Sequence, residues 1–181
     1  MNKKYELTNS DKNGLYPKVL ITSFKGKNNS SSLLLNIIKT NGIDKLELTN
    51  SFITSENEIK SKINKNNYKY IISFGQKPNC NHINIELFGI KNDNMLENTF
   101  PYKDLMAFLE ENNIKYSISK NAGNYLCNNI YYESMKYIKD NALDIKVIFI
   151  HVPPINMEYD FDETAKVLSN FIESLVSKEK L

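Results

Sequence analysis

Apolar residues recur along this chain in two alternating patterns, one typical of buried strands and one typical of amphipathic helices. Short apolar runs predict strands at 19–23, 45–48, 70–75, 83–87, 116–118 and 147–150. Apolar residues at helical spacing predict helices at 30–40, 55–66, 101–112, 125–139 and 163–176. Because strands and helices alternate, we expect a three-layer α/β/α sandwich with a mostly parallel, twisted central sheet.

Local signals add three expectations to this pattern. Ser55 and Glu58 have the spacing of a capping box, so the second helix is expected to begin near Ser55. Residues 92–98 are predicted to form a loop. Residues 1–16 are polar and are expected to form a flexible N-terminal arm, which leaves 17–181 as a single α/β domain.

Composition narrows the class of protein. The chain has 181 residues, with 41% hydrophobic and 24% charged residues, as in soluble globular proteins. Its net charge of +2 is spread without a basic block, which gives no indication of nucleic-acid or membrane binding. No segment has the apolar length of a signal peptide core or a membrane span. Two cysteines without an export signal indicate reduced thiols and a cytoplasmic location.

The candidate chemistry gathers at one predicted edge of the sheet. Ligands of such folds bind at the carboxyl ends of the strands. Residues 23–26, residues 74–76, the turn before Cys127, and His151 all belong to that edge. We therefore expect Cys127 and His151 to share one cleft.

Cys127 stands near the start of a predicted helix, after a turn that contains Gly123. The partial positive charge of a helix start favours a thiolate, and a neighbouring His151 would act as base and acid. Backbone N–H groups of the same turn could form an oxyanion hole. Spacing alone leaves a second interpretation open, in which Cys127 is a small core residue and His151 a structural one.

Glu86 is the candidate partner for the imidazole. It lies in an otherwise apolar and amide-rich stretch, where it is either a solvated outer-face residue or a buried residue that orients a base. Strand alternation by itself favours the solvated interpretation.

Two other kinds of site are weaker. Cys80, His82, Cys127 and His151 provide a Cys2His2 set, but Cys-x-His is not a usual zinc spacing, so no metal is expected. Residues 25–31 join a strand to a helix and contain Lys and Ser, but they lack the P-loop pattern. An exposed polar loop with a helix cap is therefore favoured over phosphate binding.

Five segments occur in the order found in pyroglutamyl peptidase I, the pyrrolidone carboxyl peptidase family of cysteine peptidases. They are 19–24, 73–76, 83–90, 121–128 and 149–153. The most specific are Ala-Gly-Asn-Tyr-Leu-Cys-Asn and Phe-Ile-His-Val-Pro. From about residue 18 to 176, the chain resembles a shortened, divergent member of that family.

The resemblance implies a Cys–His–Glu triad that removes an N-terminal pyroglutamyl residue from peptides through a thioester. Cys127 corresponds to the nucleophile, His151 to the general base and acid, and Glu86 to the residue that orients the imidazole. No cofactor is implied. Family members are often tetrameric, so a homo-oligomer is compatible with the resemblance, although the sequence has no interface feature that argues for one.

The resemblance also implies a set of substrate-binding residues. Phe24 corresponds to an aromatic residue that packs on the pyrrolidone ring, and Gln76 lies in the family's Gly-Gln turn near the substrate. Tyr125 and Leu126 correspond to positions that line the ring pocket.

Several family features are absent. A second ring-contacting Phe is missing after Phe24, and Lys77 begins a turn that is Gly-rich in the family. All 23 basic residues are Lys, so the family's Arg after Glu86 has no counterpart, and Lys91 and Asn92 are the candidates to replace it. A homologue with altered amide specificity, or with a binding role only, is the alternative.

Overall fold

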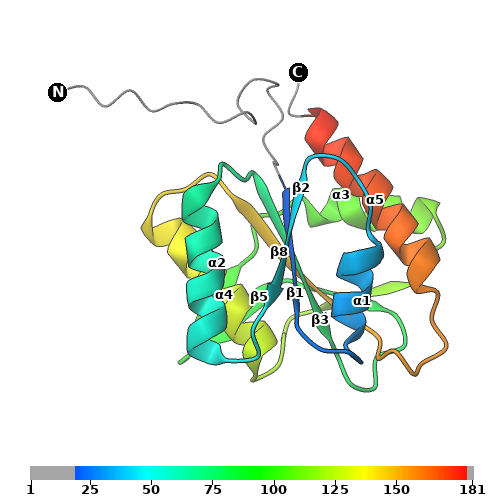
Figure 1. Cartoon of the computed structure of the whole chain (residues 1–181), viewed down its shortest axis with the longest axis horizontal. Coiled ribbons are helices and arrows are strands. Elements are labelled where there is room, and N and C mark those ends of the chain that lie inside the picture. Colours follow the sequence, from blue (N-terminus) through cyan, green and yellow to red (C-terminus); the bar gives the residue numbers. More distant parts are fainter. Residues whose placement is uncertain (1–18, 179–181) are drawn as a thin grey trace.

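The computed structural model describes residues 19–178 and has three layers, with a six-stranded sheet between two layers of helices (Figure 1). The sheet strands are β1 (Val19–Phe24), β2 (Ile43–Leu48), β3 (Tyr70–Gln76), β4 (Ile83–Glu86), β7 (Tyr116–Ser119) and β8 (Lys146–Val152). The helices are α1 (Ser30–Ile37), α2 (Phe52–Lys65), α3 (Tyr102–Glu111), α4 (Leu126–Asp140) and α5 (Phe161–Lys178). The predicted α/β sandwich is confirmed, whereas the predicted arm at 1–16 lies outside the described residues.

The sheet has the strand order β2-β1-β3-β8-β4-β7 and is mostly parallel, as predicted. The exception is the β4–β8 pair, which is antiparallel and places Asn84 opposite His151 and Glu86 opposite Phe149. Paired residues project from the same face of a sheet. The direction of β4 therefore puts the Glu86 and His151 side chains on one face.

Each face of the sheet packs against its own helices (Figure 1). Leu20, Ile71 and Phe149 belong to the core on the side of α2 and α4. Alternate strand positions such as Ile72 and Ile150 belong to the core on the side of α1, α3 and α5. Because both faces are covered, the strands are nearly continuous apolar runs, which is why they could be located in the sequence.

A two-stranded hairpin replaces part of the predicted loop at 92–98. Its strands are β5 (Phe88–Lys91) and β6 (Asn94–Glu97), which pair antiparallel. Asn92 and Asp93 turn the chain with φ of 48° and 61°. Positive φ at both central residues of a two-residue loop matches the right-handed twist of paired strands, and Asn and Asp tolerate it. The loop prediction was therefore wrong, and the Asn-Asp pair was the signal for the turn.

The capping box predicted at Ser55 was also wrong. Helix α2 begins at Phe52, and Ser51 is its cap, with a side chain that accepts a hydrogen bond from the Thr54 N–H. Glu58 instead accepts from the Thr49 N–H at 2.8 Å. Within residues 19–178, no helix combines the length and apolar character that a bilayer crossing requires.

Candidate active site

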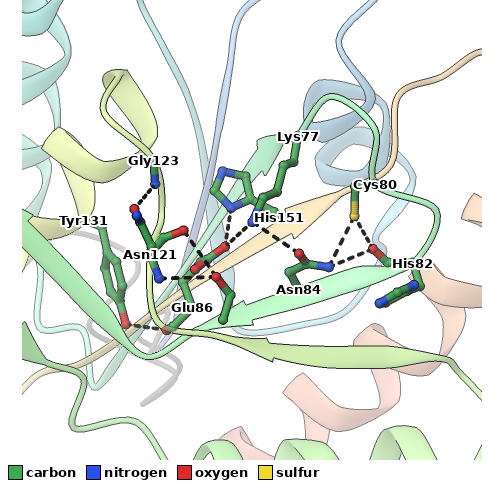
Figure 2. Close-up of polar contacts among 10 residues, drawn as sticks. Lys77, Cys80, His82, Asn84, Glu86, Asn121, Gly123, Tyr131 and His151 are labelled. Atoms are coloured by element: carbon green, nitrogen blue, oxygen red, sulfur yellow. Dashed lines mark hydrogen bonds and ion pairs between the residues drawn. The ribbon is translucent and has the colours of Figure 1, made fainter.

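Cys127 lies in the first turn of α4, at the carboxyl edge of the sheet. The loop before it is closed by Asn121, whose Oδ1 accepts from the Gly123 N–H at 2.8 Å (Figure 2). Gly123 has φ of +89°, a conformation that residues with a side chain rarely adopt. Tyr125 is the N-cap residue and makes no side-chain cap. The first N–H groups of α4 therefore have no side-chain cap.

Gly75 brings the thiol and the imidazole to the same place. A Cβ built on Gly75 would lie 2.7 Å from Cys127 Sγ, so the sulfur occupies the space over this glycine. In the parallel β3–β8 pair, Gly75 stands beside His151. Strand neighbours lie about 4.8 Å apart and point to the same face. Cys127 Sγ and His151 are therefore both placed beside Gly75, on one face of β3 and β8.

His151 and Glu86 form a buried pair. His151 Nδ1 lies 2.7 Å from Glu86 Oε1, and the two side chains are 4% and 0% exposed (Figure 2). An ionised carboxylate only accepts hydrogen bonds, so Nδ1 carries the hydrogen and Nε2 remains free to exchange a proton. The solvated interpretation of Glu86 was wrong, because its side chain is fully buried. The Tyr131 hydroxyl donates to the Glu86 carbonyl at 2.8 Å and ties α4 to the end of β4.

Lys77 also contacts this pair, although it was not among the site residues expected from the sequence. Its Nζ lies 3.2 Å from Glu86 Oε1 and 3.2 Å from Asn84 Oδ1 (Figure 2). Lys77 directly follows β3, while Glu86 is on β4, so only the strand order brings them together. The available signal was the lysine at the start of a turn that is Gly-rich in the family.

The environment of the thiol decides its protonation state. The pKa of Cys127 is raised to about 12, mainly by burial and also by the charge of Glu86. A hydrogen bond from its own backbone N–H and the charge of Lys77 lower the pKa, but by less. The resting thiol is therefore protonated at neutral pH. The helix start alone does not make a thiolate here, and a neighbouring base is needed.

The residues expected to bind substrate near Cys127 differ in their burial. Phe24 and Leu126 are both buried in the core on the side of α2 and α4, against which Cys127 also packs. Tyr125 is 67% exposed, and its ring meets Phe52 edge to face with centroids 5.4 Å apart. Phe52 was not recognised in the sequence, where nothing distinguishes it from other aromatic residues at a helix start.

The Gln76 side chain lies on the other face of the sheet. Its Oε1 accepts hydrogen bonds from the Ser30 N–H at 2.9 Å and the Ser30 hydroxyl at 3.1 Å. The amide therefore caps α1 and is not brought to Cys127. This arrangement, together with the Asn29 cap on the Ser31 N–H, engages the N–H groups that a phosphate would need in the loop at 25–31.

The weaker sequence hypotheses receive no support. Among residues 19–178, no three His, Cys, Asp or Glu side chains are grouped to hold a metal. Cys80 donates to the His82 carbonyl at 2.5 Å. Lys91 does not take the place of the family's Arg, because its ammonium is bound to Glu133 at 2.5 Å. Asn92 is at the tip of the β5–β6 hairpin.

Comparisons with known proteins agree with one another. A family model described as pyroglutamyl peptidase matches residues 95–177. Pyrrolidone-carboxylate peptidase 1 of Caldanaerobacter subterraneus is 29% identical over 166 residues, covering 75% of this chain and 82% of the relative. The pyrrolidone-carboxylate peptidase of Finegoldia magna is 25% identical over 182 residues, covering 83% and 85%.

Solved structures show the same fold. The pyrrolidone carboxyl peptidase of Thermococcus litoralis superposes with a TM-score of 0.77 at 21% identity, covering 91% of this chain and 96% of that one. The pyroglutamyl peptidase I of Bacillus amyloliquefaciens gives a TM-score of 0.75 at 21% identity, covering 84% and 91%.

Proposed function

We propose that this chain is a divergent member of the pyroglutamyl peptidase family and that it hydrolyses the amide bond after an N-terminal pyroglutamyl residue, as its similarity to these peptidases in sequence and fold suggests. The observation that carries the proposal is the buried His151–Glu86 pair beside Gly75, with the Cys127 sulfur directly over that glycine. A nucleophile, a base and a group that orients the base are the parts that covalent acyl transfer requires.

In the proposed reaction, Cys127 Sγ attacks the carbonyl carbon of the pyroglutamyl residue while His151 takes the thiol proton. The uncapped N–H groups at the start of α4 stabilise the negative oxygen of the tetrahedral intermediate. The C–N bond then breaks, His151 gives its proton to the leaving amine, and a thioester remains on Cys127. Water, deprotonated by His151, cleaves the thioester and releases pyroglutamate and the free thiol.

An apolar pocket suits the ring of a pyroglutamyl substrate. The pyroglutamyl lactam has no charged α-amine, so its pocket needs no acidic side chain to bind it. Phe24, Leu126 and Tyr125 are the proposed ring contacts, and Phe52 is added because its ring packs on Tyr125. Gln76 can contribute only through its backbone, because its side chain caps α1.

Replacing Glu86 by Gln is expected to lower kcat/KM about 10³-fold to 10⁴-fold, because the amide no longer fixes the imidazole tautomer or stabilises the imidazolium. Rates on a fluorogenic pyroglutamyl amide measure this loss. Glu133→Gln is the matched control, since it changes another largely buried glutamate of the α4 layer and is expected to keep activity within a few-fold. Equal losses in the two variants would argue that Glu86 has only a structural role.

The direct test of function is hydrolysis of pyroglutamyl-aminomethylcoumarin by the purified protein around neutral pH. Release of aminomethylcoumarin that is abolished by alkylation of Cys127 supports the proposal. No hydrolysis of this substrate, with Cys127 intact and the protein folded, would reject it and favour altered amide specificity or a binding role.

We also propose that the protein acts in the cytoplasm. Cys80 and Cys127 are both free thiols, which is typical of a reducing compartment.

A further inference from the structure

Lys77 is a charged residue at the site that the reaction described above does not use. It leaves β3 at the carboxyl edge and extends over the end of β4, where its ammonium meets Asn84 and Glu86 (Figure 2). Its side chain is 32% exposed, whereas Glu86 is fully buried. The ammonium therefore reaches from the solvent edge of the site down to the buried carboxylate.

The buried Glu86 carboxylate is stabilised by its contact with the Lys77 ammonium. Glu86 Oε1 contacts both His151 Nδ1 and Lys77 Nζ. Glu86 Oε2 is buried and makes no hydrogen bond to any of residues 19–178. A buried carboxylate with a neutral imidazole as its one polar neighbour would be an uncompensated charge, which is strongly unfavourable. Lys77 offsets that charge and leaves the pair with His151 in place.

The same ammonium acts on the nucleophile. Burial is the main cause of the raised pKa of the Cys127 thiol; the charge of Glu86 also raises this pKa, and the charge of Lys77 lowers it. The other groups that face Lys77 are Asn84, from β4, and His151, from β8. Cys80 follows in the loop, where its sulfur accepts a hydrogen bond from the Asn84 amide at 3.3 Å. Glu86 supplies the carboxylate in contact with Lys77, and the lysine ammonium pairs with it at 3.2 Å.

We propose that Lys77 is a positioning residue for the hydrolysis, which holds Asn84 and Glu86 at the sheet edge and supplies a positive charge beside the triad of this arginine-free chain. The inference rests on the proposed function for its role in turnover. Its electrostatic part stands on the contacts alone, because charge compensation at Glu86 affects the thiol whether or not a peptide is cleaved.

Lys77→Met tests the inference through the pH dependence of kcat/KM on the fluorogenic pyroglutamyl amide. Loss of a nearby positive charge makes every neighbouring group hold its proton more tightly. Both limbs of the profile are therefore expected to move up by about one pH unit, reduced from the full Coulomb effect because the ammonium is partly solvated. Lys77→Arg keeps the charge and is expected to restore the profile. A uniform loss of activity with unmoved limbs would overturn the proposal in favour of a structural role.

Lys91→Met is the matched control. Lys91 is 40% exposed and pairs with the largely buried Glu133, so the substitution removes the same charge from a comparable ion pair. Both limbs of the pH profile of kcat/KM of Lys91→Met are expected to lie at the same pH as in the wild type. Limbs that move equally in Lys77→Met and Lys91→Met would show a general charge effect and would contradict a specific role of Lys77.

A second measurement separates this inference from the proposed function. The rate of Cys127 alkylation by iodoacetamide, followed by peptide mass spectrometry, needs no substrate. At a fixed pH below the pKa of the thiol, Lys77→Met is expected to react roughly threefold to tenfold more slowly than wild type and Lys77→Arg. Slower alkylation in a protein that cleaves no pyroglutamyl amide would reject the function and retain the inference. Unchanged alkylation in an active enzyme would reject the inference alone.

Discussion

A Cys127→Ala variant is expected to lose about 10⁵-fold or more in kcat on pyroglutamyl amides, because removing a nucleophile removes the covalent route entirely. The wild-type thiol packs over Gly75 and beside the His151 strand, so alanine leaves the surrounding contacts and the fold in place. Release of aminomethylcoumarin gives the rate, and circular dichroism verifies folding.

The chain supplies its own control for this experiment. Cys80 is the other cysteine, is buried, and hydrogen-bonds within its loop to the His82 carbonyl. Cys80→Ala is expected to keep activity within a few-fold. If Cys80→Ala were inactive and Cys127→Ala active, the assignment of the nucleophile would be wrong.

The second large effect is expected at Gly75, which carries no reacting group. An alanine Cβ would lie 2.7 Å from Cys127 Sγ and 2.8 Å from Phe149 Cζ, closer than real Cβ contacts. Either the sulfur or the Phe149 ring must move. The Phe149 ring is buried and packs on His151 with centroids 5.0 Å apart, so both outcomes disturb the catalytic pair. We expect Gly75→Ala to lower kcat/KM at least ~10²-fold, since small misplacements at reacting centres have that effect.

Gly89→Ala is the control for the effect of overpacking without a change at the thiol. That Cβ would lie 2.8 Å from the Tyr132 backbone on α4, so the variant has a comparable clash away from the thiol. Both variants are expected to lose about 1–3 kcal/mol of unfolding free energy in urea titrations. Only Gly75→Ala is expected to lose most of its activity and to change the rate of Cys127 alkylation. Full activity of Gly75→Ala would show that the sulfur does not occupy this space during catalysis.

The elements of the fold could be predicted from the sequence because burial leaves a local mark. Strands covered on both faces are continuous apolar runs, and α4 could be placed within one residue because the turn at Gly123 precedes its apolar pattern. The same locality explains the errors. Ser51 and Ser55 both suit a cap, and only the packing of α2 selects the former.

Site residues that depend on strand pairing could not be predicted from a local pattern. Whether Glu86 is buried depends on the antiparallel placement of β4 beside β8, and the face taken by Gln76 depends on its position one residue after Gly75. Lys77 follows β3 and meets Glu86 on β4, with β8 between these two strands in the sheet, so this contact between residues nine positions apart depends on the order of the strands. The family resemblance was enough to predict the three triad residues, whereas the contact of Lys77 with Glu86 could be seen only in the folded sheet.

Covalent chemistry at Cys127 is the central feature of the proposed function. The most direct test is intact-mass and peptide-level spectrometry of the enzyme, quenched in acid during turnover of a pyroglutamyl ester or amide. We expect a fraction of the protein to be heavier by one pyroglutamyl acyl group, and we expect this group on Cys127. Mild alkaline treatment is expected to remove the acyl group, and the Cys127→Ala variant is expected to lack it. Turnover by wild type with the acyl group on another residue, or equal turnover by Cys127→Ala, would contradict covalent chemistry at Cys127.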